Sequence, residues 1–291
     1  MGGINDLGQI VGSYLYASGF PAISHAFVYD GSTYTDLQSP LAASLNNSSI
    51  LSTAASGINN LGEIVGNYTY VDVGSGQTVG SGFLDINGTF TNIYYPSAAT
   101  TAVTGVNNFG VIVGYYQATI GGAYQGFTYD HGTYATLDNP TNAPYLIPTG
   151  INDAGDIVGY FPDSFINAYH GFLATPVVQP VSYSYTTIDY QAPYRTFLYD
   201  INDEGQILAH SPQFGVNLLY SNGSFTTLDN LNNQTVFPAL TYSTSINDSG
   251  QIIGMWGSQG FLYSNGVSQA CSIRIRVSIK HHQTRSTILA K

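Results

Sequence analysis

The chain has 291 residues, and 8% of them are charged, against about 25% in an average soluble protein. Its formal net charge is −11 at pH 7. Residues 1–270 contain all 17 acidic side chains and a single basic one, Arg195. A body this acidic repels phosphate backbones and anionic membranes, so the composition argues against nucleic-acid binding. No apolar run is long enough to span a membrane, so we also expect no membrane insertion.

One sequence motif recurs six times along the chain. Its first position is Ile or Val, its second is Asn, and its third is Asp or Asn. Any residue, a Gly, any residue and two aliphatic residues follow in that order. Its asparagines are separated by 54, 48, 45, 50 and 45 residues, and they are Asn5, Asn59, Asn107, Asn152, Asn202 and Asn247. A repeat of this length is typical of propellers and stacked arrays, in which each unit buries its apolar face against the next.

The unit at residues 102–138 shows the internal order of a repeat most clearly. Four short runs rich in Val, Ile, Thr, Tyr and Phe lie at 102–107, 111–116, 125–129 and 133–137. Gly, Asn and Asp stand between them, and this pattern predicts β-strands joined by tight turns. Four antiparallel strands per unit are typical of a propeller blade.

We therefore predict an all-β fold, a single β-propeller with six four-stranded blades and little or no helix. In chain order the blades span about residues 1–38, 53–93, 102–138, 147–189, 195–229 and 241–280.

The last predicted blade lacks the usual end of its fourth strand. Ser272–Lys280 stands in that place, with aliphatic residues alternating with polar or basic ones. This alternation predicts an outermost strand with a cationic outer face, and an extension unrelated to the blade is the alternative. We expect the basic tail at residues 281–291 to be disordered.

Turn chemistry explains the polar half of the motif. Asn and Asp side chains can bond to their own backbone two residues later, and Gly supplies the positive φ that a tight hairpin needs. We interpret four motif aspartates as turn formers between the first and second strands: Asp6, Asp153, Asp203 and Asp248. We expect the glycine after the aliphatic pair to allow close approach of neighbouring backbones near the axis. It occurs in five repeats, as Gly12, Gly66, Gly114, Gly159 and Gly254.

The first blade has almost no residues for its innermost strand before Ile4. Propellers protect their terminal blades by completing a sheet from both chain ends or by packing blade on blade. We therefore expect a weak seam between the first and sixth blades, or upstream residues that seal it. The chain opens at Met1 directly inside a repeat motif, and we interpret this as a truncated start.

Two repeats also share a third strand that begins His-Ala-Phe (His25-Ala26-Phe27) or His-Gly-Phe (His170-Gly171-Phe172). With the Asn-containing motif and a Thr-Thr-Leu/Ile-Asp fourth strand, these segments resemble the HAF-type repeats of bacterial extracellular proteins. The resemblance covers about residues 3–266. It implies a secreted or surface protein built from repeats, and it carries over no catalytic residue.

The polar residues do not form a pattern that would specify a metal site or a catalytic site. Each motif turn offers Ca²⁺ one carboxylate, or an amide at Asn60 and Asn108, so turn chemistry is favoured over calcium binding. The histidines are scattered rather than spaced as zinc ligands, at His25, His131, His170 and His210. No nucleophile elbow or phosphate loop is present. We predict no metal, no cofactor and no identifiable catalytic residue.

The loops that join one blade to the next are rich in aromatic residues and proline. In a propeller these connections gather on one face around the channel, where binding sites usually lie. Tyrosine rings beside Asn, Asp and Gln would suit stacking on sugar rings. We therefore predict a ligand-binding site at Tyr95, Tyr145, Tyr194 and Tyr242. The alternative is that Pro and Tyr only stiffen and pack these connections.

The favoured function is binding or scaffolding by a monomeric extracellular propeller, with a polysaccharide or a surface protein as partner. A glycan lyase or hydrolase is the second hypothesis, and it needs two acidic groups or an acid–base pair in one pocket. Asp163, Asp189 and Asp229, near the connecting loops, are the candidates for that role. The third hypothesis is a structural module of a larger surface assembly.

Overall fold

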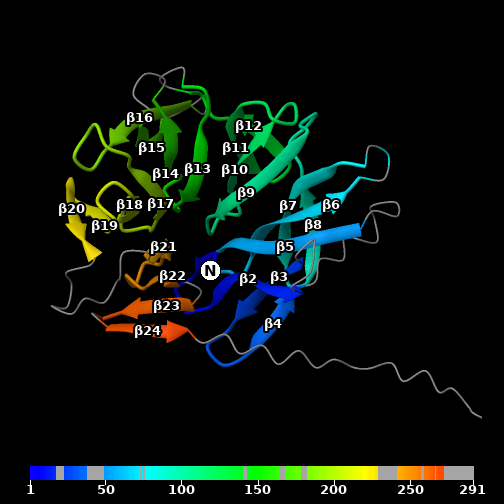
Figure 1. Ribbon diagram of the computed structural model, residues 1–291, viewed down its shortest axis with the longest axis horizontal. Coiled ribbons are helices and arrows are strands. Elements are labelled where there is room, and N and C mark those ends of the chain that lie inside the picture. Colours follow the sequence, from blue (N-terminus) through cyan, green and yellow to red (C-terminus); the bar gives the residue numbers. More distant parts are fainter. Residues whose placement is uncertain are drawn as a thin grey trace, which may run out of the picture.

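The computed structural model describes residues 1–17, 23–37, 49–72, 74, 76–139, 143–163, 168–177, 182–228, 241–256, 259–265 and 267–271. Within these ranges every regular element is a β-strand, and no helix could cross a membrane. The strands form six four-stranded sheets in which consecutive strands pair antiparallel. Figure 1 shows the sheets arranged radially about a common centre, with the N-terminus near it. The predicted all-β, six-bladed propeller is therefore confirmed.

The first half of the ring contains three blades. Blade 1 consists of β1 (Gly3–Ile4), β2 (Ile10–Ala17), β3 (Ile23–Tyr29) and β4 (Tyr34–Leu37). Blade 2 consists of β5 (Ser49–Ile58), β6 (Ile64–Val71), β7 (Thr78–Ile86) and β8 (Thr89–Ile93). Blade 3 consists of β9 (Thr100–Val106), β10 (Ile112–Gln117), β11 (Tyr124–Asp130) and β12 (Thr133–Thr136). The first strand of each blade lines the central channel.

The second half repeats this order. Blade 4 consists of β13 (Ile147–Ile151), β14 (Ile157–Pro162), β15 (Tyr169–Val177) and β16 (Ser182–Ile188). Blade 5 consists of β17 (Phe197–Ile201), β18 (Ile207–Ser211), β19 (Val216–Ser221) and β20 (Ser224–Thr227). Blade 6 consists of β21 (Thr241–Ile246), β22 (Ile252–Trp256), β23 (Gln259–Ser264) and β24 (Val267–Cys271).

The outer edge of blade 6 differs from the prediction. β24 pairs antiparallel with β23, so the fourth strand of this blade is Val267–Cys271 and not Ser272–Lys280. The hairpin signal begins at Ser264, the last residue of β23, which pairs with Val267, the first residue of β24. A tight turn there leaves no room for a later segment in fourth place. Ser272–Lys280 and the basic tail at 281–291 lie outside the described residues.

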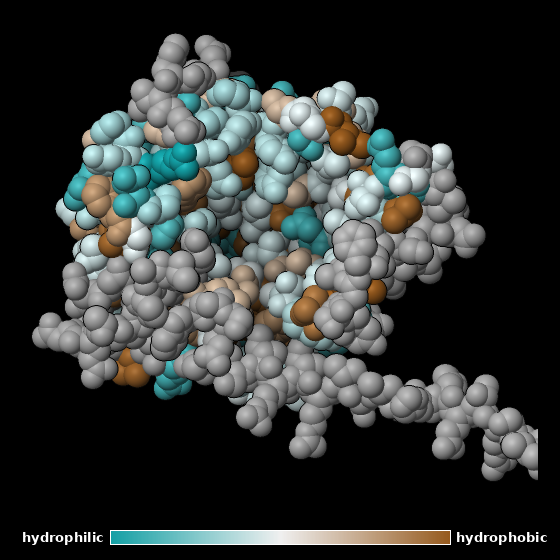
Figure 2. Space-filling view, in the orientation of Figure 1, coloured by the Kyte–Doolittle hydropathy of each residue, from teal (hydrophilic) through white to brown (hydrophobic). Residues whose placement is uncertain are grey.

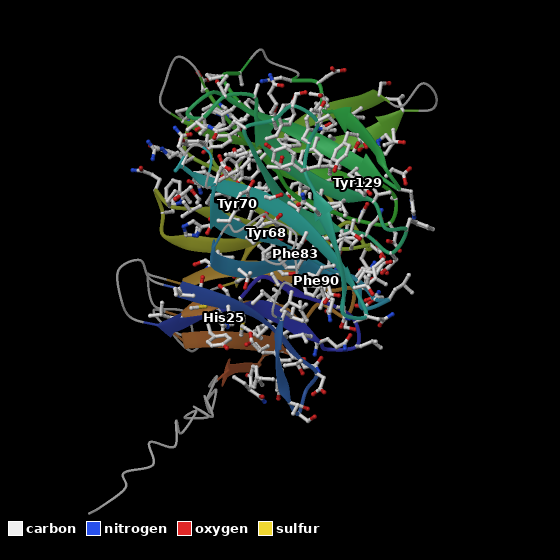
Figure 3. The ribbon with its side chains drawn as sticks, turned by 90° about the vertical axis from the view of Figure 1, so that its right-hand side faces the viewer. His25, Tyr68, Tyr70, Phe83, Phe90 and Tyr129 are labelled. Carbon is white, nitrogen blue, oxygen red and sulfur yellow. The ribbon has the colours of Figure 1, made fainter. Side chains whose placement is uncertain are left out.

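The apolar core lies between neighbouring blades. At the interface of blades 2 and 3, one buried cluster contains Val65, Ile93, Val103 and Phe127. Full burial of such a side chain stabilises the fold by about 1.5–3 kcal/mol. Phenylalanines on the third strands add ring contacts. The ring centroids of Phe83 and of Phe90 in β8, for example, lie 5.4 Å apart (Figure 3). Repetition of these clusters around the ring explains why each repeat keeps the same apolar positions.

The glycine after the aliphatic pair faces a large side chain of its own blade. Gly114 in β10 pairs with Phe127 in β11, and four other blades have the same Gly–Phe pair. A Cβ atom at Gly114 would overlap the carbonyl oxygen of Ala102 in β9 and lie 2.9 Å from the Phe127 ring. The expected close approach of a neighbouring backbone is therefore confirmed at Gly114, and that backbone is the first strand of the same blade. Blade 5 instead pairs Ala209 with Leu218.

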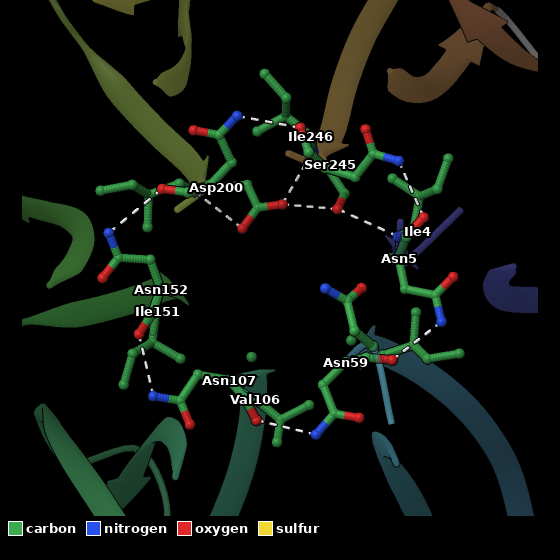
Figure 4. A pocket seen from close by; sticks show the side chains of 18 of the residues that line it. Ile4, Asn5, Asn59, Val106, Asn107, Ile151, Asn152, Asp200, Ser245 and Ile246 are labelled. Carbon is green, nitrogen blue, oxygen red and sulfur yellow. Dashed lines mark hydrogen bonds between the residues drawn. The ribbon is translucent and has the colours of Figure 1, made fainter. Parts of the chain in front are cut away.

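The motif asparagines close the ring. Nδ2 of Asn5 donates to the main-chain oxygen of Asn59 at 3.0 Å, and the same bond joins each following blade to the next at 2.9–3.3 Å. Asn247 completes the circle by donating to the main-chain oxygen of Asn5 at 3.0 Å (Figure 4). In all six blades Oδ1 of the asparagine accepts the N–H four residues later, which shapes the turn.

The residue after each asparagine makes a second ring of hydrogen bonds, which corrects the turn-former interpretation. The N–H of Asp153 donates to Oδ1 of Asp203, and the N–H of Asp203 donates to Oδ1 of Asp248, both at 2.7 Å. The N–H of Asp248 donates to Oδ1 of Asp6 at 2.9 Å, and the amides in blades 2 and 3 complete the circle. These side chains therefore link blades, while the asparagine caps the turn. The positive φ of the motif glycine, 74° at Gly8, is confirmed.

The seam between blades 1 and 6 is hydrogen-bonded like the other junctions. Both rings continue across it, and the N–H of Ile4 also donates to Oγ of Ser245 at 3.3 Å. The apolar contact is small, because β1 has two residues and the buried cluster consists of Ile4, Ile10 and Ile253. The predicted weak seam is thus wrong for the polar contacts, which the repeated motif supplies at every junction.

The surface matches the low charge content. In Figure 2 pale colours dominate one face of the molecule, and brown hydrophobic residues occur in small separate groups. Uncharged Ser, Thr, Gly and Tyr have such intermediate hydropathy. The face is therefore polar without carrying many charges.

Candidate functional site

The central channel is narrow and polar, with a volume of about 90 Å³. Blades 1 to 4 have a glycine before the aliphatic residue of the motif, whereas Asp200 and Ser245 take that place in blades 5 and 6. Ser245 Oγ donates to Oδ2 of Asp200 at 2.6 Å, and the N–H of Ile246 donates to the same oxygen at 3.0 Å (Figure 4). Burial raises the pKa of Asp200 to about 6, although these bonds oppose the shift. The channel is smaller than the roughly 300–1,000 Å³ of most ligand pockets.

Carboxylates form most of the rim at one end of the channel. Burial raises the pKa of Asp248 to about 7, and the nearby carboxylates of Asp6 and Asp203 add to the shift. Burial also raises the pKa of Asp203. No group of His, Cys, Asp and Glu in the described part of the chain has the arrangement of a metal site. Asp203 and Asp248 therefore hold protons more readily than isolated aspartates do.

A pocket of about 380 Å³ lies between blade 3 and its connection to blade 4, and we call it the loop-face pocket. It lies at the end of the blades opposite the motif turns, where β11 begins and β12 ends. The rings of Tyr124 and Tyr145 line it, with centroids 6.0 Å apart and planes at 88°. Gln125, Thr136 and the exposed Asp138 also line it. Flat aromatic surface therefore lies beside amide, hydroxyl and carboxylate groups.

Neighbouring aromatic residues hold Tyr145 in place. Its hydroxyl donates to the hydroxyl of Tyr169 at 2.9 Å. The Tyr169 ring lies 4.9 Å from the ring of Phe197, and the guanidinium carbon of Arg195 lies 5.4 Å from the Tyr169 centroid. Burial and the Tyr169 hydroxyl raise the pKa of Tyr145, so its hydroxyl stays protonated at neutral pH. An aromatic wall fixed in this way loses little conformational entropy on binding.

A stacked tyrosine pair fixes two polar groups of the pocket. The ring of Tyr95 lies 3.7 Å from the ring of Tyr116, with their planes at 5°. The Tyr116 hydroxyl donates to Oε1 of Gln125 at 2.5 Å, and the Tyr95 hydroxyl lies 2.7 Å from Oγ1 of Thr136. Because Gln125 and Thr136 line the pocket, this pair supports it from behind.

The four tyrosines predicted as the binding site do not gather in one place. Tyr145 lines the loop-face pocket, and Tyr95 supports it through its hydroxyl. Tyr194 is 43% exposed, packs edge-on against Phe214 and is not among the residues that line the pocket. Tyr242 belongs to β21, and its side chain lies outside the described part of the chain.

Sequence reasoning missed Tyr124 and Gln125, because they belong to β11 and not to a connecting loop. The available signal was the residue at the start of the third strand. Gln125 stands where two other repeats have His25 and His170. Asp138 was also missed as a site residue, because its segment was interpreted as the end of a fourth strand.

A second polar cluster lies in blade 4. Nδ1 of His170 lies 2.6 Å from Oδ2 of Asp189, and Nε2 lies 3.4 Å from Oδ2 of Asp163. Burial lowers the pKa of His170, but the bonds and charges of the two carboxylates outweigh it, and the net shift is upward. Two of the three acidic candidates therefore lie together, and neither lines the loop-face pocket. The third, Asp229, lies outside the described residues.

No protein-family model matches the sequence, and no curated protein matches it. Among solved structures, TolB from Acinetobacter baumannii is similar with a TM-score of 0.58 and 13% identity, over 88% of this chain and 61% of that one. A mutant Aleuria aurantia lectin in complex with Fucalpha1-6GlcNAc has a TM-score of 0.53 and 10% identity, over 92% and 93% of the two chains. Virginiamycin B lyase from Staphylococcus aureus has a TM-score of 0.45 and 11% identity, over 94% and 84%. At these identities the likeness shows the fold alone.

Proposed function

We propose that this chain is an extracellular, carbohydrate-binding β-propeller built from HAF-type repeats, and that the loop-face pocket holds the sugar. The observation that carries the proposal is the pair of nearly perpendicular rings of Tyr124 and Tyr145 beside Asp138. The C–H face of a sugar ring packs on an aromatic face, while its hydroxyls bond to carboxylate and amide groups. A mixed pocket of this kind, with few polar groups in fixed places, is typical of small-ligand sites.

The fold supports the proposal only at the level of architecture. The Aleuria aurantia lectin, which has a propeller similar to this one, is bound to Fucalpha1-6GlcNAc in its structure. A fold does not determine a function, so the argument for this chain depends on its own pocket. The predicted secretion depends on the HAF-type resemblance of residues 3–266.

An enzyme that acts on glycans is the second candidate, because Asp163, His170 and Asp189 form a linked acid–base group. Glycoside hydrolysis usually needs two carboxyl groups on either side of one bond. Here both carboxylates face the same imidazole, and neither is part of the loop-face pocket. Binding without turnover is therefore the favoured function.

The test is retention of the purified full-length chain on insoluble and immobilised polysaccharides, with reducing ends and unsaturated products assayed in the same tubes. Retention without product supports the proposal. Release of product would favour the enzyme and direct attention to His170. Absence of both would overturn the proposal and favour a structural or protein-binding module.

A further inference from the structure

A large cavity lies between blades 1 and 2, near their motif turns. Its volume is about 790 Å³, and we call it the interblade groove. Blade 1 contributes Val28 and Leu37 to its walls, and blade 2 contributes Leu61, Asp85 and Phe90. None of these residues lines the loop-face pocket, so the groove is a separate feature.

The groove lies where one repeat position differs from that in the other blades. Cross-strand register places Asp85 opposite Ile64 and Phe90. In four other blades a tyrosine occupies this register position: Tyr29, Tyr129, Tyr220 and Tyr263. Blade 4 has Ala174 there, opposite Tyr185. Blade 2 alone has a carboxylate at this position.

The tyrosine elsewhere fills the space between two blades. Tyr129 packs against the same apolar cluster as Leu84 of the preceding blade. In the same way Tyr220 packs against one cluster with Leu173 of its preceding blade. At the interface of blades 1 and 2, Val28 of blade 1 takes the place of this leucine. Asp85, which is shorter than tyrosine, faces it. A short carboxylate in place of a ring leaves the volume that forms the groove.

Asp85 is buried within this apolar setting. The residue as a whole is only 4% exposed. Oδ1 accepts the N–H of Gly88 at 2.7 Å, and no described residue donates to Oδ2. Burial raises the pKa of Asp85, and the Gly88 bond opposes the shift. A carboxylate that is largely removed from water, with one oxygen that receives no hydrogen bond from a described residue, is stabilised by a positive charge beside it.

The other charged side chains around the groove also favour a positively charged ligand. Asp36 also lines it, and its carboxylate lies 3.2 Å from Nδ1 of His25 on blade 1 (Figure 3 labels His25). Among the described residues that line the groove, none is Lys or Arg. The apolar walls are provided by Val28, Leu61 and Phe90. The groove thus combines an aliphatic and aromatic surface with negative charge.

We propose that the interblade groove binds an organic cation with an aliphatic body, its ammonium or guanidinium group at Asp85 and its hydrocarbon part against Val28, Leu61 and Phe90. The cation supplies the donors that Oδ2 of Asp85 lacks, in a charge-assisted hydrogen bond. The hydrocarbon part is removed from water against the apolar walls, which stabilises the complex in proportion to the buried area.

The test uses the full-length chain and hexylammonium as probe, with hexanol and hexanoate as uncharged and anionic controls, measured by calorimetric titration. Asp85→Asn is the matched variant, because its side-chain oxygen can still accept the Gly88 N–H. We expect this change to weaken hexylammonium binding by about tenfold or more. Asp85→Tyr restores the ring of the other blades and should abolish binding by filling the groove. Glu204→Gln, at the exposed tip of a motif turn in blade 5 and outside both pockets, is the control and should leave binding unchanged.

Equal binding of hexylammonium and hexanol would overturn the proposal, because the charge would then contribute nothing. Binding by Asp85→Asn within about twofold of the parent chain would overturn it as well. If Asp85→Tyr does not fold, the Asp85→Asn titration alone decides the outcome. These measurements are independent of sugar binding at the loop-face pocket.

Discussion

The amide group of Asn247 donates a hydrogen bond of 3.0 Å to the main-chain oxygen of Asn5, 242 residues earlier in the sequence. The same side chain donates to Oε1 of Gln251 at 2.8 Å and accepts the Gln251 N–H at 2.9 Å. One asparagine therefore shapes its own turn and joins the last blade to the first. Because five equivalent asparagines do the same, the ring has no junction without this bond.

Replacement of Asn247 by alanine should destabilise the propeller. The change removes one of the two donors to the buried carbonyl of Asn5, which keeps the Gly8 N–H, and it leaves the Gln251 N–H without its acceptor. We therefore expect a loss of about 1–3 kcal/mol in the free energy of unfolding. Urea denaturation followed by tyrosine fluorescence measures the difference. Glu204→Ala, at the exposed tip of a motif turn in blade 5, is the control and should change stability by less than about 0.5 kcal/mol. Equal effects of the two changes would show that the ring bond does not stabilise the fold.

Substitution of Gly114 by alanine should destabilise the fold, and it should destabilise the fold less when Phe127 is also replaced by leucine. Overpacking of this kind destabilises by about 1–3 kcal/mol, because the new Cβ meets the Ala102 carbonyl and the Phe127 ring. Blade 5 has Ala209 and Leu218 at the paired positions. We therefore expect Phe127→Leu to recover part of the loss caused by Gly114→Ala.

A double-mutant cycle of thermal or urea unfolding measures this coupling. The two changes are in contact, so a favourable interaction free energy of about 0.5–3 kcal/mol is expected. Strict additivity of the two losses would show that the aromatic ring is not what requires the glycine.

The propeller should be more stable in mildly acidic solution than at pH 8. Burial raises the pKa of Asp200 to about 6 and that of Asp248 to about 7, from 3.8. Between pH 4 and pH 7 the folded chain therefore binds more protons than the unfolded chain, and the free energy of unfolding falls as pH rises. His170, whose pKa is also raised, contributes in the same direction, because its stabilising charge is present below pH 6.5 and is lost as pH rises through its folded pKa.

Urea midpoints at pH 5 and pH 8 test this dependence. Asp200→Asn has the shape of the protonated side chain without its titration, so it should reduce the difference between the two midpoints. A midpoint that is higher at pH 8 in the parent chain would contradict the expected sign.

Truncation of the pocket tyrosines should weaken sugar binding. Tyr124→Ala and Tyr145→Ala each remove a flat wall of the loop-face pocket, and we expect about tenfold weaker affinity for the polysaccharide that retains the parent chain. Tyr194→Ala removes an aromatic ring that is 43% exposed and lies outside that pocket, so it is the matched control. A larger effect at Tyr194 than at Tyr145 would place the site elsewhere on the propeller.

The site was less predictable than the fold, and particular residues show why. Tyr95 and Tyr145 could be selected because aromatic residues in blade connections stand out in the sequence. Their separate roles, one behind the pocket and one in its wall, depend on which ring of blade 3 each of them meets. Tyr124 and Asp138 come from strand ends, and no local pattern distinguishes them from residues that only form a sheet.

The repeat alone determined that this protein is a closed ring of six four-stranded blades, because a motif of turn and strand signals at a regular period forces each unit to bury its apolar face on the next. The tertiary structure decided what the motif aspartates do, since only ring closure brings the N–H of Asp248 to the carboxylate of Asp6. It also decided the effect of a single departure from the repeat. Asp85 looks like an ordinary hairpin residue in the sequence, and it becomes a buried charge only because Val28 of another blade lies across from it. Packing between units acts over distances in sequence that no local pattern records.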